Sequence, residues 1–112
     1  MILINLLSDT GFVMTSKLLI KLIGLDSAIF LSELCSEYNY WEEKDKLSDE
    51  KWFFSTRENI ERNTGLSEYR QKNAMCLLIK KELISIKKIG IPRKIYYKLD
   101  EEKIKLLFKN AK

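Results

Sequence analysis

The sequence contains no histidine, one proline, four glycines and two cysteines in 112 residues. Without histidine, and with Cys35 and Cys76 far apart, the chain cannot build a zinc site of the usual cysteine and histidine type. So few glycines and prolines disfavour an all-β sandwich or barrel, which needs many turns, and favour helices. Both cysteines fall in apolar helical patterns, so we expect buried or half-buried thiols in a reducing compartment.

Long apolar runs are also missing. A membrane-spanning helix needs about 20 consecutive apolar residues, whereas the apolar runs at 2–7 and 18–23 are short and bounded by polar residues. The first residues lack the basic charge of a signal peptide. We therefore expect a cytoplasmic protein that does not enter a membrane.

The composition fits one globular domain over residues 1–112, because 46% of the residues are hydrophobic and a chain of this length can bury a core without disulfides or metal. Charge is distributed unevenly. Residues 67–112 carry 13 basic and 5 acidic side chains, whereas residues 1–66 carry 7 basic and 11 acidic ones. This uneven distribution of charge indicates either a basic surface that binds a polyanion or an ordinary solvated surface.

The first part of the chain is expected to be helical after an N-terminal arm. Residues 1–12 are apolar and reach a glycine, which suggests a strand or an arm that packs on the body. A short helix is expected at 15–22, because Gly24 can stop it. A longer helix follows, which Asp26 or Ser27 can cap and whose apolar residues recur every three or four positions.

A highly charged segment, residues 42–51, predicts an exposed loop. The aromatic run at 52–54 predicts a short strand. Ser55 and Glu58 match a capping box, in which each side chain accepts a hydrogen bond from the backbone N–H of the other residue. A helix to about Asn63 is expected to follow.

The segment 64–67, Thr-Gly-Leu-Ser, predicts a tight turn between two helices. Gly65 can adopt the left-handed conformation that ends the first helix. Ser67 can cap the second helix, which we expect at 68–81.

Two alternating segments, 83–88 and 94–99, predict a β-hairpin, and Asp100 can cap a last helix. The expected order of elements is that of a winged helix-turn-helix: helix, short strand, helix, glycine turn, helix and hairpin. We therefore expect a mainly α fold with a small antiparallel β-hairpin, of the winged helix-turn-helix class. Its expected parts are an N-terminal arm with a short helix (1–25), a winged-helix core (26–99) and a C-terminal helix (100–112).

The helix at 68–81 is the candidate recognition helix, which must bury one face and leave the other free to enter a DNA major groove. At 100° per residue, an inward side and an outward side separate. Inward residues are Gln71, Ala74, Met75 and Leu78. Outward residues are Tyr69, Lys72, Asn73, Cys76 and Lys80, a pattern that fits either a DNA-reading surface or any solvated amphipathic helix. With the cap, the candidate DNA-binding residues here are Ser67, Tyr69, Arg70, Lys72, Asn73 and Lys80.

The hairpin is the candidate wing. Lys87, Lys88, Arg93 and Lys94 place four cations within eight residues, as expected of a segment that contacts phosphates. The alternative is that these lysines protect an exposed hairpin edge from aggregation.

Several segments together resemble a known family: Thr64-Gly65-Leu66-Ser67, Leu83-Ile84, Gly90, Pro92 and Tyr96, with Gly11-Phe12-Val13, Ala28-Ile29-Phe30-Leu31 and Trp52-Phe53-Phe54-Ser55 upstream. They resemble the winged-helix N-terminal domain of DnaD-like replication initiators and replisome organisers, which occur in phages and other mobile elements of Gram-positive bacteria. The resemblance implies double-stranded DNA binding during replication initiation. The sequence departs from the family at Glu82, where a glycine is common. Family members commonly carry a second, C-terminal domain that helps to load replication proteins, and the resemblance does not extend to that domain.

No catalytic motif is present, and we expect neither an enzyme nor a cofactor. Double-stranded DNA is the expected partner. Two alternatives remain open: a transcription regulator with the same fold, and a protein-interaction module that binds a host or replisome protein. Self-association through the N-terminal arm or the C-terminal helix is compatible with each of them.

Overall fold

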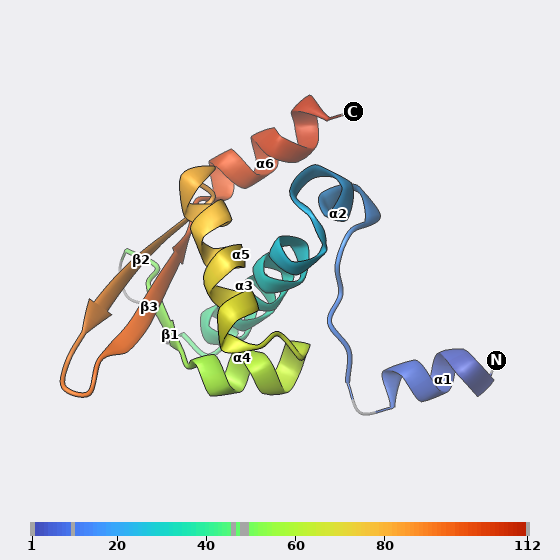
Figure 1. The fold of residues 1–112 in the computed structure, drawn as a ribbon, viewed down its shortest axis with the longest axis horizontal. Helices are drawn as coiled ribbons and strands as arrows, with labels where there is room; N and C mark the ends of the chain where they lie inside the picture. The colour runs from blue at the N-terminus through green and yellow to red at the C-terminus, as the bar shows by residue number, and fades with distance from the viewer. Residues whose placement is uncertain (1, 10, 46, 48–49, 112) are drawn as a thin grey trace.

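The computed structural model describes residues 2–9, 11–45, 47 and 50–111. Over these residues the chain forms six helices and one three-stranded antiparallel sheet (Figure 1). The expected mainly α fold with a small antiparallel hairpin is therefore confirmed, and the expected short strand joins the hairpin as a third strand. Among the described residues, no helix has the length and apolar character needed to cross a membrane.

The elements follow the chain in this order: α1 (Ile2–Ser8), α2 (Lys17–Ile23), α3 (Leu25–Glu43), β1 (Phe53–Ser55), α4 (Arg57–Thr64), α5 (Glu68–Lys80), β2 (Ile84–Ile89), β3 (Lys94–Leu99) and α6 (Glu101–Asn110). Three expected segments lie partly outside the described residues: the arm through Met1 and Thr10, the charged loop through Lys46, Ser48 and Asp49, and the C-terminal segment through Lys112.

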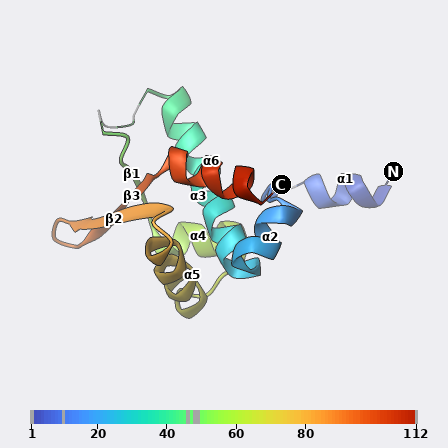
Figure 2. The same cartoon turned by 90° about the horizontal axis from the view of Figure 1, so that it is seen from above.

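The N-terminal arm was expected to be a strand or to pack on the body, and this expectation is wrong. Residues 2–8 form helix α1, and all of their side chains are exposed. Figures 1 and 2 show α1 standing apart from the other helices at the end of an extended segment. The physical reason is the sequence pattern: Ile-Leu-Ile-Asn-Leu-Leu does not alternate as a half-buried strand would, and leucine favours a helix.

Two expected helix caps are also wrong. Helix α3 begins after Gly24, which ends α2 as well, so Asp26 and Ser27 lie inside the first turn of α3. Helix α4 is capped by Thr56, whose hydroxyl accepts a hydrogen bond from the Asn59 N–H at 3.0 Å. The capping box fails because the residue expected as its cap, Ser55, is the last residue of β1 and is buried.

The sheet has the order β1-β3-β2, so β3 is the central strand. Tyr97 of β3 pairs with Phe53 of β1 and Ile86 of β2, and its side chain is fully buried. The ring of Phe30, on α3, meets the Tyr97 ring edge-on with centroids 6.1 Å apart. Helices α3 and α5 therefore cover one face of the sheet, and Figure 2 shows the hairpin projecting beyond them.

Helix α6 begins where the sequence predicts. The Asp100 carboxylate accepts a hydrogen bond from the Lys103 N–H at 3.0 Å. Ile104, Leu107 and Phe108 pack against the core as partly buried residues. Ile104 and Phe108 also line a groove together with residues of α2 and α3.

Candidate nucleic-acid interface

The turn between α4 and α5 has the geometry that its sequence predicts. Gly65 is left-handed, with φ 78° and ψ 1°, and its N–H donates to the Glu61 carbonyl at 2.7 Å. Leu66 is buried and fixes the turn to the core. The Ser67 hydroxyl accepts a hydrogen bond from the Arg70 N–H at 3.3 Å and so caps α5.

A buried glutamine fixes α5 to α4 and to this turn. Gln71 is 1% exposed, and its side-chain nitrogen donates to the Leu66 carbonyl at 2.9 Å and to the Arg57 carbonyl at 3.0 Å. The rest of the inward side is buried as expected, with Ala74, Met75 and Leu78 in the core. The orientation of α5 is therefore set by its inner face.

The outward side of α5 is exposed as predicted. Tyr69 is 74% exposed, and Ser67, Lys72, Asn73 and Lys80 are also exposed. These side chains lie on one helix that the core holds in place. The arrangement offers amide, hydroxyl and ammonium groups, which are suited to base edges and phosphates.

Arg70 is exposed, but its guanidinium is already paired. Its Nε and Nη2 donate to the two carboxylate oxygens of Asp26 at 2.8 and 2.6 Å. Hydrogen bonding to Arg70 lowers the pKa of Asp26, and the same pair raises the pKa of Arg70. The bidentate pair ties α5 to α3, so Arg70 positions the helix rather than offering a free cation.

The four predicted cations of the hairpin do not form one set. The Lys87 ammonium lies 4.3 Å from the centre of the Trp52 ring, and the Lys94 ammonium lies 5.2 Å from the centre of the Phe54 ring. Lys88 and Arg93, together with Lys94, line a cavity of about 430 Å³ between the hairpin and the start of α4.

Arg57 lines the same cavity, and sequence reasoning missed it. Its side chain forms an ion pair with Glu68 at the start of α5, so it connects the hairpin cavity to α5. The first N–H groups of any α-helix have no helical acceptor and favour anions. Arg57 is the first residue of α4. Its place directly after the aromatic segment, at the expected start of a helix, is the sequence signal that could have identified it as a basic residue beside an anion site. Glu58 is an acidic residue of the lining, which limits the positive charge there.

The two cysteines differ from expectation, because both are exposed free thiols. Among the residues that the structure describes, no group of three or more cysteine, aspartate or glutamate side chains could hold a metal ion. Comparisons with protein-family models, curated proteins and solved structures find no match to this chain.

Proposed function

We propose that the chain is a winged helix-turn-helix domain that binds double-stranded DNA without catalysis. In this proposal α4, the Gly65 turn and α5 form the helix-turn-helix, and β2 and β3 form the wing. The exposed side of α5 enters the major groove, while Lys88 and Arg93 contact phosphates. Resemblance to DnaD-like initiators suggests replication initiation of a phage or mobile element, in the cytoplasm, as the process.

One observation carries this proposal. A helix held by a buried glutamine and an apolar stripe exposes Tyr69, Lys72 and Asn73, and a hairpin with Lys88 and Arg93 stands beside it. Asparagine can pair with an adenine edge, and lysine can reach guanine or phosphate. Basic residues on neighbouring elements are the expected electrostatic footprint of a duplex.

The test is fluorescence anisotropy with a labelled random duplex at two salt concentrations. We expect binding that weakens as salt rises, with each phosphate contact adding about 0.9 to the logarithmic slope. The variant Lys72→Glu/Lys88→Glu/Arg93→Glu should lose binding. Its matched control is Lys103→Glu/Lys105→Glu/Lys109→Glu on α6, which makes the same change in charge and should keep binding. Absence of binding by the wild type at low salt would overturn the proposal.

Self-association through the N-terminal arm is a second candidate, which the surface of α1 favours. Ile2, Leu3, Ile4, Leu6 and Leu7 are each between 60% and 76% exposed. A helix of seven residues is too short to be stable by itself in water. This arm therefore needs a partner surface, and its lack of charged residues favours an apolar one.

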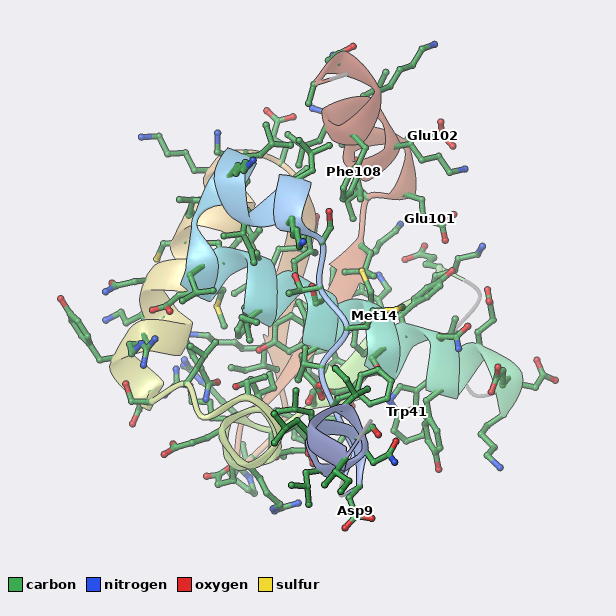
Figure 3. All side chains as sticks on the ribbon, turned by 90° about the vertical axis from the view of Figure 1, so that its right-hand side faces the viewer. Asp9, Met14, Trp41, Glu101, Glu102 and Phe108 are labelled. Atoms are coloured by element: carbon green, nitrogen blue, oxygen red, sulfur yellow. The ribbon has the colours of Figure 1, made fainter. Side chains whose placement is uncertain are left out.

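The same chain offers such a surface. A groove of about 740 Å³ lies between the segment before α2, α3 and α6, and its lining includes Met14, Leu19, Leu31 and Phe108. Figure 3 shows Met14 and Phe108 on the same side of the molecule. Reciprocal insertion of α1 into the groove of a second copy would cover the exposed apolar side chains of both helices.

Sedimentation velocity over a range of concentrations tests self-association. We expect dimers at high concentration that Leu3→Glu/Leu7→Glu removes and Lys105→Glu retains. A wild-type chain that stays monomeric at every concentration would contradict reciprocal insertion.

A further inference from the structure

The outer face of the sheet carries a row of aromatic and basic side chains. Phe54 pairs with Tyr96, and Tyr96 pairs with Lys87 on its other side. Directly paired residues in antiparallel strands project from the same face. Their neighbours Phe53, Tyr97 and Ile86 form the inner row, which packs against the core. The row of Phe54, Tyr96 and Lys87 therefore faces away from α5 and from Phe30 of α3.

The aromatic rings of this face lie close together at the surface. The Phe54 and Tyr96 ring centres are 5.9 Å apart, with their planes at 45°. Trp52 and Trp41 line a groove of about 600 Å³ together with these two rings. The half-buried state of Trp52, Phe54 and Tyr96 leaves part of each ring accessible to a ligand.

Lysines surround the same rings. Lys94 and Lys98 lie two residues before and after Tyr96 on β3, and the side-chain period of a strand places them on the same face. The ammonium groups of Lys87 and Lys94 lie over the Trp52 and Phe54 rings. A flat ligand that stacks on a ring can displace the lysine above it, and the released ammonium is then within reach of an anionic group of that ligand.

Rings that stack flat groups, with cations beside them, are the features that recognise single-stranded nucleic acid. In a duplex the base faces are covered by neighbouring bases, so a stacking surface selects unpaired bases. We propose that the outer sheet face, defined as Trp52, Phe54, Tyr96, Lys87, Lys94 and Lys98, is a binding site for single-stranded nucleic acid. Bases stack on the aromatic residues, and phosphates bind the lysines.

The lining of the groove also includes an acidic residue. This residue is Asp45, which lies in the lining with Trp41 and Leu47. A carboxylate repels phosphate but can accept a hydrogen bond from a base N–H group, such as the ring N–H of thymine. We therefore place the bases over Trp52 and Tyr96 and the phosphates on Lys94 and Lys98, which flank Tyr96 along β3. This site is separate from the duplex-binding surface of α5, because α5 packs against the opposite face of the sheet.

Tryptophan fluorescence provides a direct readout, since both tryptophans of the chain line the groove. The probe is a 15-residue oligodeoxythymidine, titrated at low salt into the full chain. We expect saturable quenching, which a Trp41→Phe variant retains because Trp52 is the stacking residue. Tyr96→Ser should raise the dissociation constant at least about fivefold, the effect of losing one stacked base.

Tyr96 is half-buried, so its variant is accompanied by a surface variant. Lys94→Glu/Lys98→Glu leaves the rings intact and should also weaken binding, with a smaller salt dependence. The matched control is Lys72→Glu/Lys80→Glu on α5, which makes the same charge change and should bind the oligonucleotide as the wild type does.

Two results would overturn the proposal. One is no quenching of the wild type at low salt. The other is quenching that the α5 variant loses and that the Lys94→Glu/Lys98→Glu variant keeps, because the single strand would then occupy the duplex site. Duplex anisotropy is measured on the same variants. A wild-type chain that shows quenching with the single strand but no duplex binding would contradict the proposed function and leave the sheet-face site supported, whereas loss of duplex binding by the α5 variant alone is the expected result.

Discussion

Helices α1 and α5 both expose many side chains, but they differ in what holds them. Helix α5 buries Gln71 and three apolar residues and exposes polar ones, whereas α1 exposes apolar residues on every side. The exposed groups of α5 can therefore be changed without loss of the fold, since the opposite face anchors the helix. For α1 the exposed apolar groups are the proposed self-association surface, so the two helices should respond differently to substitution.

Removing the anchor of α5 should have the largest effect. Gln71→Ala deletes the amide that donates to the Leu66 and Arg57 carbonyls and leaves a cavity, so we expect a loss of about 2–3 kcal/mol in the free energy of unfolding. Chemical denaturation measures this loss. Lys72→Ala on the outward side is the control and should change stability by less than about 0.5 kcal/mol. Equal effects of the two substitutions would mean that α5 is anchored elsewhere.

A rise in pH should lower the free energy of unfolding, because it ionises Glu37 on α3, the helix on which α5 packs. Burial, and then the neighbouring Glu33, raise the pKa of Glu37 on α3 from 4.5 to about 8. Between these pH values the unfolded chain loses the Glu37 proton while the folded chain keeps it, so stability should fall as pH rises from about 4.5 to 8. Because the Glu37 residue is only partly buried, water screens part of the cost, and we expect roughly 1–2 kcal/mol.

Glu37→Gln isolates this contribution, since glutamine does not ionise. Its unfolding free energy should vary less over the same pH range and should exceed that of the wild type at pH 9. Thermal or urea unfolding at a series of pH values gives both quantities. A wild-type curve that rises toward pH 8 would show that another group controls this range.

A substitution just after the end of α5 should give a smaller change, an increase in stability. Glu82 is left-handed, with φ 61°. The Leu83 N–H donates to the Leu78 carbonyl and the Glu82 N–H to the Ile79 carbonyl, which is the hydrogen-bond pattern of a Schellman motif. This position normally holds glycine. Glu82→Gly and Glu82→Ala both remove the exposed ion pair with Lys103, but only glycine relieves the backbone.

We therefore expect the glycine variant to be more stable than the alanine variant by about 1 kcal/mol, and slightly more stable than the wild type. Paired thermal denaturation measures the difference. Alanine and glycine variants of equal stability would mean that the turn relaxes to another conformation.

The smallest effect is expected in α1. Leu6→Ser should change the unfolding free energy of the monomer by less than about 0.5 kcal/mol, because Leu6 is 63% exposed and α1 contains no buried residue. The measurement is urea unfolding at a concentration below any association. A loss comparable to that of Gln71→Ala would show that α1 does pack on the body and would remove the contrast between the two helices.

Local sequence signals predicted the turn between α4 and α5 well. Gly65 ends α4, Leu66 is buried and Ser67 caps α5, as their residue types favour. The alternating sequence of the two hairpin segments likewise predicted that they form strands. Those signals act between residues close in the chain. For the same reason, the inward and outward sides of α5 followed from its periodicity.

Contacts between distant residues explain the failures. Asp26 resembles a cap, but its carboxylate binds Arg70, which is 44 residues away. Ser55 resembles a cap as well, but pairing with Ile95 makes it part of the sheet. Neither partner can be inferred from local sequence, and the same limit concealed the place of Arg57 beside the hairpin cavity.

Tyr96 and Tyr97 are consecutive, yet one lies on the outer face of the sheet and the other is fully buried in the core. The strand β3 that carries them is hydrogen-bonded on both sides. A slip of one residue would exchange the two tyrosines and turn every lysine of the strand toward the core. Inserted or deleted residues should therefore be tolerated in the loop between β2 and β3 but not within β3, because that strand aligns the core and the surface together.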